Sequence, residues 1–281
     1  MDRQYSAGVL HRNTRFTRAG LWAAVLLFAG GMFSASGVQA GELNLERLSP
    51  EEIGTVNGIL EKLVPLIEDK RASGDIAKLT FEEVYVPLLP EEKAFLKWFQ
   101  DFDPLKAGIK TKWQGISEGV PDLVRVEGQT TSLADGRQEI LPPQFVPPDV
   151  YDAYGRMMQA MQKDIGRRLF IESGYRSPAY QLYLFLFYLG NHEYSIRETA
   201  RWNAFPGYSE HGNPANQALD FINESGISGE TNPADFEALP EYAWLVDHAG
   251  EYGFVLSFPE DDPTGIAFEP WHWRYQPDPR A

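Results

Sequence analysis

No cysteine occurs anywhere in this chain of 281 residues. Any fold it adopts must therefore be held by an apolar core rather than by disulfides, and 43% hydrophobic residues are enough for an ordinary core. The same absence excludes thiol nucleophiles, thiolate zinc sites and iron–sulfur clusters. A metal could be bound only by histidine and carboxylate side chains.

The first forty residues have the order of a secretory signal peptide. Residues 1–18 carry four arginines, an apolar stretch runs from Leu21 to Phe33, and Val38 and Ala40 stand at the small-residue positions of a signal-peptidase site. The apolar stretch is shorter than the about 20 residues of a membrane span. We expect cleavage after Ala40 and an exported protein, periplasmic or extracellular. An uncleaved N-terminal anchor is the alternative.

Acidic residues outnumber basic ones by 40 to 25, which gives a net charge of −15. Affinity for nucleic acid and for anionic lipid rests on Lys and Arg, so the charge excludes nucleic acid as a partner. No later stretch approaches spanning length, and we expect no stable membrane insertion once the signal is removed.

Residues 41–112 are predicted to form a mainly helical N-terminal region, whose role the sequence does not indicate. Ser49 precedes Pro50 and stands three residues before Glu52, the pattern of a capping box with proline in the first turn. Apolar residues then recur at helical spacing across residues 53–67. A long helix is therefore expected to begin here.

Residues 113–281 mix helices with short strands, which predicts an α+β domain. Ser177 and Pro178 open a predicted helix that is apolar almost all round and so is expected to be buried. Strands are predicted at Gln217–Ile222 and at Ile266–Phe268.

Two histidines and two acids lie in surroundings that favour chemistry. His211 lies in a turn-rich loop, Asp220 lies within an apolar strand, and Glu269 stands three residues before His272. A carboxylate in apolar company needs a cation, hydrogen-bond donors or a metal to offset its desolvation. Catalytic zinc keeps three protein ligands and an open position, and a further carboxylate beside it can act as a base. The alternative is two capped or core histidines with two ion-paired acids, and the residue types alone do not decide.

Six short blocks in fixed order carry a resemblance to a known family. They are SGYRSPAYQ at 173–181, SEH at 209–211, ALD at 218–220, YGF at 252–254, TG at 264–265 and EPWH at 269–272. Together they resemble the VanY-like D-alanyl-D-alanine carboxypeptidases, M15 zinc peptidases of bacterial cell-wall metabolism, over about residues 141–275. The resemblance implies a small antiparallel sheet with flanking helices, of the Hedgehog and D,D-peptidase type.

The resemblance also implies roles for individual side chains. The residues that match the family's zinc ligands are His211, Asp220 and His272. Glu269 matches the catalytic base, and Arg176 matches an arginine near the scissile carbonyl, where a fixed guanidinium stabilises developing negative charge. A structural salt bridge is the alternative for Arg176. Gln181 and Ser209 fall at positions that line the substrate pocket.

The expected reaction is the zinc-dependent hydrolysis of the terminal D-Ala amide of a peptidoglycan stem peptide. An L,D-carboxypeptidase or a peptidoglycan endopeptidase would use the same site. The alternative of another class is a catalytically silent cell-wall-binding module, against which the intact Glu269 argues because a pure binder needs no base.

Two spacings must be accommodated by the fold if these residues are to form one metal site. Eight residues separate His211 from Asp220, two more than is usual in the family, with Pro214 where a glycine is common. We expect the additional residues to bulge outward. Glu269 and His272 would point to opposite faces of a regular strand, so a bend at Pro270 has to bring both to the metal.

Overall fold

The computed structural model describes residues 43–120, 122–132, 136–229, 233–261 and 266–276. The predicted signal peptide, residues 1–40, lies outside these ranges. Within them, no helix is both long enough and apolar enough to cross a bilayer.

The N-terminal region is helical, as predicted. Helix α1 spans Pro50–Ser73, with the Ser49–Glu52 capping box formed in both directions and Gly74 ending it in the left-handed conformation. Three shorter elements follow, namely η2 (Ile76–Lys78), α2 (Phe81–Tyr85) and α3 (Pro90–Asp101). The apolar face of α1, which includes Val56, Ile59 and Leu63, is fully buried.

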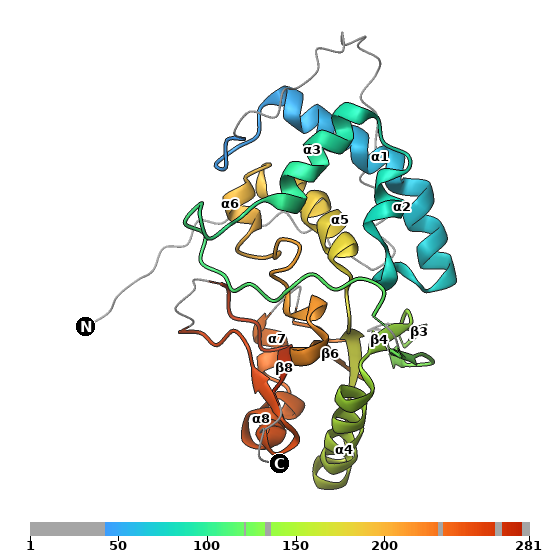
Figure 1. Cartoon of the computed structure of the whole chain (residues 1–281). Helices are drawn as coiled ribbons and strands as arrows, with labels where there is room; N and C mark the ends of the chain where they lie inside the picture. The colour runs from blue at the N-terminus through green and yellow to red at the C-terminus, as the bar shows by residue number, and fades with distance from the viewer. Residues whose placement is uncertain (1–42, 121, 133–135, 230–232, 262–265, 277–281) are drawn as a thin grey trace, which may run out of the picture. The chain divides into compact units, whose positions relative to one another are not determined.

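These helices pack against a helix from the later part of the chain. Helix α5 spans Pro178–Leu189, so it begins where Ser177 and Pro178 predicted, and the Ser177 hydroxyl caps it. Figure 1 shows α5 beside α1 and α3. Buried residues of these three helices form one continuous apolar cluster, in which the Phe99 and Phe185 rings lie 6.1 Å apart. The near-uniform apolar surface of α5 is thereby covered.

The largest sheet is antiparallel and has the strand order β5-β6-β8-β7. Its strands are β5 (Leu169–Ser173), β6 (Ala218–Asn223), β8 (His272–Tyr275) and β7 (Phe254–Leu256). Two antiparallel pairs lie beside it, β1 (Val124–Val126) with β4 (Gln144–Val146) and β2 (Thr130–Ser132) with β3 (Gln138–Ile140). The expected α+β fold with a small antiparallel sheet and flanking helices is confirmed.

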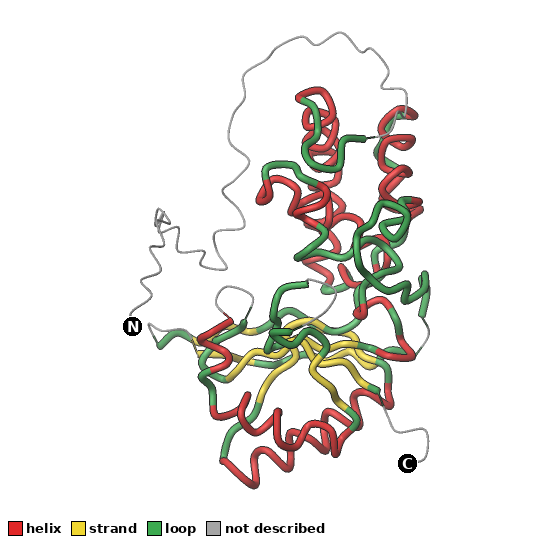
Figure 2. Tube along the Cα trace, turned by 90° about the vertical axis from the view of Figure 1, so that its left-hand side faces the viewer, coloured by secondary structure: helices red, strands yellow, loops and turns green. Residues whose placement is uncertain are grey.

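Helices α4 (Pro148–Ile165) and α8 (Pro240–His248) cover one face of this sheet (Figure 2). The methionines of α4 at positions 157, 158 and 161 are buried there, and Met157 and Met161 share a cluster with Phe221 of β6. The remaining short elements are α6 (Ile196–Thr199), α7 (Pro233–Glu237), η3 (Gly190–His192), η4 (Glu210–Gly212), η5 (Pro214–Asn216) and η6 (Ala249–Tyr252).

The predicted strand at Ile266–Phe268 is wrong, because these residues have no regular structure. The next residue, Glu269, donates its backbone N–H to the carbonyl of Phe258, 3.1 Å away. The chain then turns at residues 270–271 and forms a strand only from His272, in β8.

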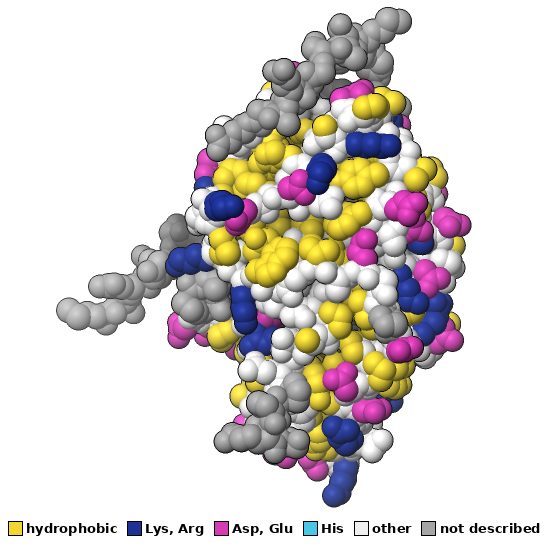
Figure 3. Space-filling model, viewed as in Figure 1, with side chains coloured by type: hydrophobic (Ala, Val, Ile, Leu, Met, Phe, Trp, Pro, Cys, Tyr) yellow, Lys and Arg dark blue, Asp and Glu magenta, His cyan; other side chains and the backbone are white. Residues whose placement is uncertain are grey.

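An extended segment, residues 113–118, runs over the loop that carries His211, and we call it the strap (Figure 1). Its backbone N–H groups at Gln114 and Gly115 both donate to the Gly207 carbonyl, at 2.7 and 3.1 Å, and the Ser117 hydroxyl donates to the Gly212 carbonyl at 2.8 Å. Trp113 on the strap stays 53% exposed. Hydrophobic side chains also gather on this face over α3 and α6 (Figure 3).

Candidate metal centre

His211 is fixed from both its backbone and its ring. It lies in η4, where its backbone N–H donates to the Ser209 hydroxyl at 3.3 Å. Ring Nδ1 donates to the carbonyl of Gly174 at 2.8 Å, which turns Nε2 toward Asp220. Nε2 lies 3.1 Å from Oδ2 of Asp220 but makes no hydrogen bond, although it is buried.

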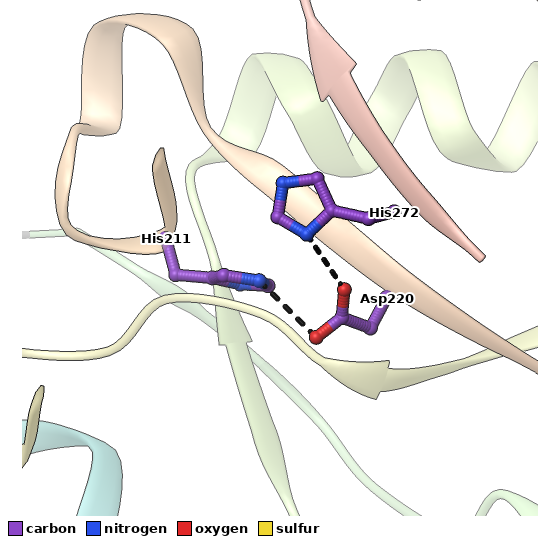
Figure 4. A group of neighbouring side chains, drawn as sticks. All are labelled: His211, Asp220 and His272. Carbon is purple, nitrogen blue, oxygen red and sulfur yellow. Dashed lines mark hydrogen bonds and ion pairs between the residues drawn. The ribbon is translucent and has the colours of Figure 1, made fainter. Parts of the chain in front are cut away.

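Asp220 and His272 face each other across neighbouring strands. They are directly paired in the β6–β8 register, and Nδ1 of His272 donates to Oδ1 of Asp220 at 2.9 Å (Figure 4). The Asp220 carboxylate therefore has one oxygen toward each imidazole. Donor atoms of His211, Asp220 and His272 lie within 4.8 Å of one another, so the structure brings the three predicted ligands together.

The additional residues between His211 and Asp220 form the short turn η5, which Asn213 caps by accepting from the backbone N–H of Ala215. Residues 213–216 are half-buried or exposed, whereas Gln217 and Ala218, which lead into β6, are fully buried. The loop thus projects outward without disturbing the strand that carries Asp220.

A turn at Pro270 brings Glu269 to the same place. The backbone N–H of His272 donates to the Glu269 carbonyl at 3.1 Å, and Oε2 of Glu269 lies 3.6 Å from Nδ1 of His272. The expected bend is therefore present. Burial raises the pKa of the Glu269 carboxyl to about 7, with the Asp220 charge acting in the same direction and the His272 charge against it.

The two imidazoles differ in charge when no metal is bound. Burial, followed by the charge of Arg176, lowers the pKa of His211 to about 4. Burial also acts to lower the pKa of His272, but hydrogen bonds to Asp220 and Glu210 outweigh it and raise the pKa to about 10. For Asp220, burial acts to raise the pKa, whereas the two imidazoles hold it far below its usual range. His272 is thus the cation that balances these acids.

Arg176 lies next to the cluster. Its backbone N–H donates to the His211 carbonyl at 3.0 Å, and its Nε is buried without a hydrogen-bond partner. Its positive charge acts on the pKa values of both His211 and Glu269. Whether Arg176 acts on a substrate or makes a structural salt bridge stays a prediction.

Gln181 and Ser209 are both buried. Gln181 lies on α5, where its side-chain amide donates to the Ala204 carbonyl at 2.9 Å while its Oε1 makes no hydrogen bond. Ser209 supports the backbone of His211 as described above. Their role in substrate binding stays a prediction.

The sequence reasoning missed Glu210 and Arg274. Oε2 of Glu210 lies 3.1 Å from Nε2 of His272, and Oε1 accepts from Arg274 at 2.5 Å. Burial acts to raise the pKa of Glu210, but its contacts with His272 and Arg274 lower it to about 2. The sequence did offer a signal for this pair. Glu210 directly precedes His211, and Arg274 lies two residues after His272, so the His272 and Arg274 side chains lie on the same side of β8.

Comparison with known proteins identifies a family. The model of the family described as VanY, D-alanyl-D-alanine carboxypeptidase, matches residues 144–278. YodJ of Bacillus subtilis, provisionally described as a carboxypeptidase, is 32% identical over 143 residues, which are 49% of this chain and 49% of YodJ. The bifunctional D-Ala-D-Ala dipeptidase and carboxypeptidase VanXYC of Enterococcus gallinarum is 30% identical over 140 residues, 47% of this chain and 67% of that protein.

Among solved structures, the LdcB LD-carboxypeptidase matches with 26% identity and a TM-score of 0.43, covering 57% of this chain and 71% of that one. Of the two curated relatives, the chain spans about half the length of YodJ and about two thirds of the length of VanXYC. The matched residues 144–278 include every predicted site residue, whereas α1, α2, α3 and the strap lie before them.

Proposed function

Because the chain belongs to the VanY family of D-alanyl-D-alanine carboxypeptidases, we propose that it is a zinc carboxypeptidase that hydrolyses the terminal D-Ala amide of peptidoglycan stem peptides. The observation that carries this proposal is the convergence of two imidazoles and one carboxylate, with Glu269 beside them. Hydrolysis of a terminal D-Ala amide needs a group that polarises the carbonyl, a base for the attacking water and a cation near the carbonyl oxygen. The proposed metal, Glu269 and Arg176 would supply these three.

The donor set fits zinc. His211 and His272 offer nitrogen, Asp220 offers oxygen, and three such ligands are what a catalytic zinc site keeps. The buried Nε2 of His211, which makes no hydrogen bond, is supplied with a partner if a metal is bound there. Zinc in this position would supply polarisation of the scissile carbonyl and a lowered pKa of attacking water.

Glu269 is proposed as the general base. Its carboxylate lies beside the proposed ligands, with Oε2 3.6 Å from Nδ1 of His272, where it can accept a proton from water and return it to the leaving amine. Arg176 is proposed to face the carbonyl oxygen, where its guanidinium stabilises negative charge as the tetrahedral centre forms. Its buried, unpartnered Nε supports this role.

We propose Gln181 and Ser209 as substrate-binding residues, supported by the free Oε1 of Gln181 and by the contact of Ser209 with His211.

We also propose residues 1–40 as an export signal, 41–112 as the N-terminal helical region and 113–281 as the catalytic domain. An exported location fits a substrate that lies outside the cytoplasm.

The test uses purified protein with zinc, incubated with a stem pentapeptide that ends in D-Ala-D-Ala, and mass spectrometry of the products. Release of one D-Ala, lost in Glu269→Gln while one bound zinc is retained, is the expected result. Cleavage of a tetrapeptide instead would identify an L,D-carboxypeptidase, and cleavage of cross-linked dimers an endopeptidase. If wild type and Glu269→Gln are equally inert on all three substrates, the enzymatic proposal is wrong.

A further inference from the structure

Glu210 joins the two segments that carry the imidazoles. It directly precedes His211 in η4, and its side chain reaches β8, where it contacts Nε2 of His272 at 3.1 Å and Arg274 at 2.5 Å. The Glu210 side chain is only 6% exposed, so both contacts are made away from bulk water. Interactions of this kind are stronger than the same contacts at an exposed surface.

The two histidines are held through opposite ring nitrogens. His211 donates from Nδ1 to a backbone carbonyl and directs Nε2 toward Asp220. His272 donates from Nε2 to Glu210 and from Nδ1 to Asp220, so the Nδ1 proton is the one that a metal beside Asp220 would replace. A metal binds a ring nitrogen that carries no proton, and the hydrogen bond at the other nitrogen decides where the proton stays. Both rings therefore need an acceptor behind them, and for His272 the acceptor is Glu210.

We propose that Glu210, anchored by Arg274, is a positioning residue that keeps the proton of His272 on Nε2 and turns Nδ1 toward the metal. This inference rests on the proposed zinc site. A carboxylate behind a ligating imidazole orients the ring and makes its free nitrogen a stronger donor. Because Arg274 lies two residues after His272 on β8, it holds the carboxylate from the same strand that holds the ring.

A purely structural role is the competing explanation, since the Glu210–Arg274 pair also ties η4 to β8. Three variants separate the two roles. Glu210→Ala removes the acceptor, and Glu210→Gln keeps an acceptor of the same shape without the charge. Glu92→Ala is the matched control, because the Glu92 side chain is half-buried, at 13% exposure, and pairs with Lys62 at 2.7 Å in the helical region.

The experiment measures the zinc dissociation constant by chelator competition and the His272 ring protons by long-range ¹H–¹⁵N NMR of the zinc-loaded protein. We expect the dissociation constant of Glu210→Ala to rise about 10- to 100-fold, with that of Glu210→Gln in between. The wild-type spectrum should show a slowly exchanging Nε2 proton, which Glu210→Ala should lose. Glu92→Ala should bind zinc as wild type does, even where its thermal stability falls.

Zinc binding by Glu210→Ala within about threefold of wild type, with the Nε2 proton unchanged, would overturn the positioning role while leaving the metal site intact. Absence of zinc binding by the wild type itself would overturn the metal site and this inference with it. If Glu210→Ala does not fold, Glu210→Gln decides: a several-fold weaker zinc affinity supports the role, and wild-type affinity refutes it.

Discussion

A side chain at Gly207 should destabilise the protein, because the strap occupies the space that a Cβ would need. Its φ is +82°, and a Cβ there would lie 2.4 and 2.7 Å from two ring carbons of Trp113 and 2.9 Å from Ile116. In Gly207→Ala, the left-handed backbone costs about 1–2 kcal/mol, and the overlap adds about 1–3 kcal/mol through displacement of the ring. We expect a total loss of about 2–5 kcal/mol of unfolding free energy.

The lower part of this range is favoured if Trp113, which is half-exposed, swings away and loses only its edge contact with Tyr208, whose ring centroid lies 5.0 Å away. Gly108→Ala is the matched control, since Gly108 has φ +72° and nothing within 4 Å of a Cβ. It should cost only the backbone share, about 1–2 kcal/mol.

Urea unfolding followed by tryptophan fluorescence and far-UV circular dichroism measures both losses. The double variant Gly207→Ala/Trp113→Ala should be more stable than the sum of the single losses predicts, because removing the ring relieves the overlap. Equal destabilisation by Gly207→Ala and Gly108→Ala, with additive behaviour in the double variant, would refute the steric argument.

Three further predictions concern the metal centre and α1. Burial raises the Glu269 pKa from 4.5 to about 7, so the folded metal-free protein holds the Glu269 proton more tightly than the unfolded chain does. The free energy of unfolding should therefore fall as pH rises from about 4.5 to 7. Melting curves of Glu269→Gln should lack this loss. Asp220→Asn should reduce bound zinc from about one ion to near none by native mass spectrometry, whereas the exposed Asp247→Asn should keep it. Ser49→Ala removes the capping hydroxyl of α1 and should cost about 0.5–2 kcal/mol in urea unfolding, and a loss below this range would contradict the role of the cap.

Local signals predicted the elements that are set by adjacent residues. The Ser49–Glu52 pair and Pro50 placed the start of α1, and Ser177 with Pro178 placed α5, because caps act over three or four residues. The ordered blocks around the proposed metal ligands likewise indicated residues that the sheet register then brings together.

Long-range contacts explain what the sequence did not reveal. The strap has no periodic pattern, since its position depends on hydrogen bonds to Gly207 and Gly212, about ninety residues later. Glu210 and Arg274 lie 64 residues apart, and neither shows by itself that it contacts the other. The strand predicted at Ile266–Phe268 is wrong because β-propensity is a local signal that does not show whether a partner strand lies alongside.

The direct pairing of Asp220 with His272 makes the centre sensitive to strand alignment. If β8 slipped by a single residue against β6, Trp273 would take the place of His272 and the imidazole would face the opposite side of the sheet. Only chains with the correct β6–β8 register could then retain an ion. The ratio of bound ion to purified protein would therefore report the fraction of molecules that have this register.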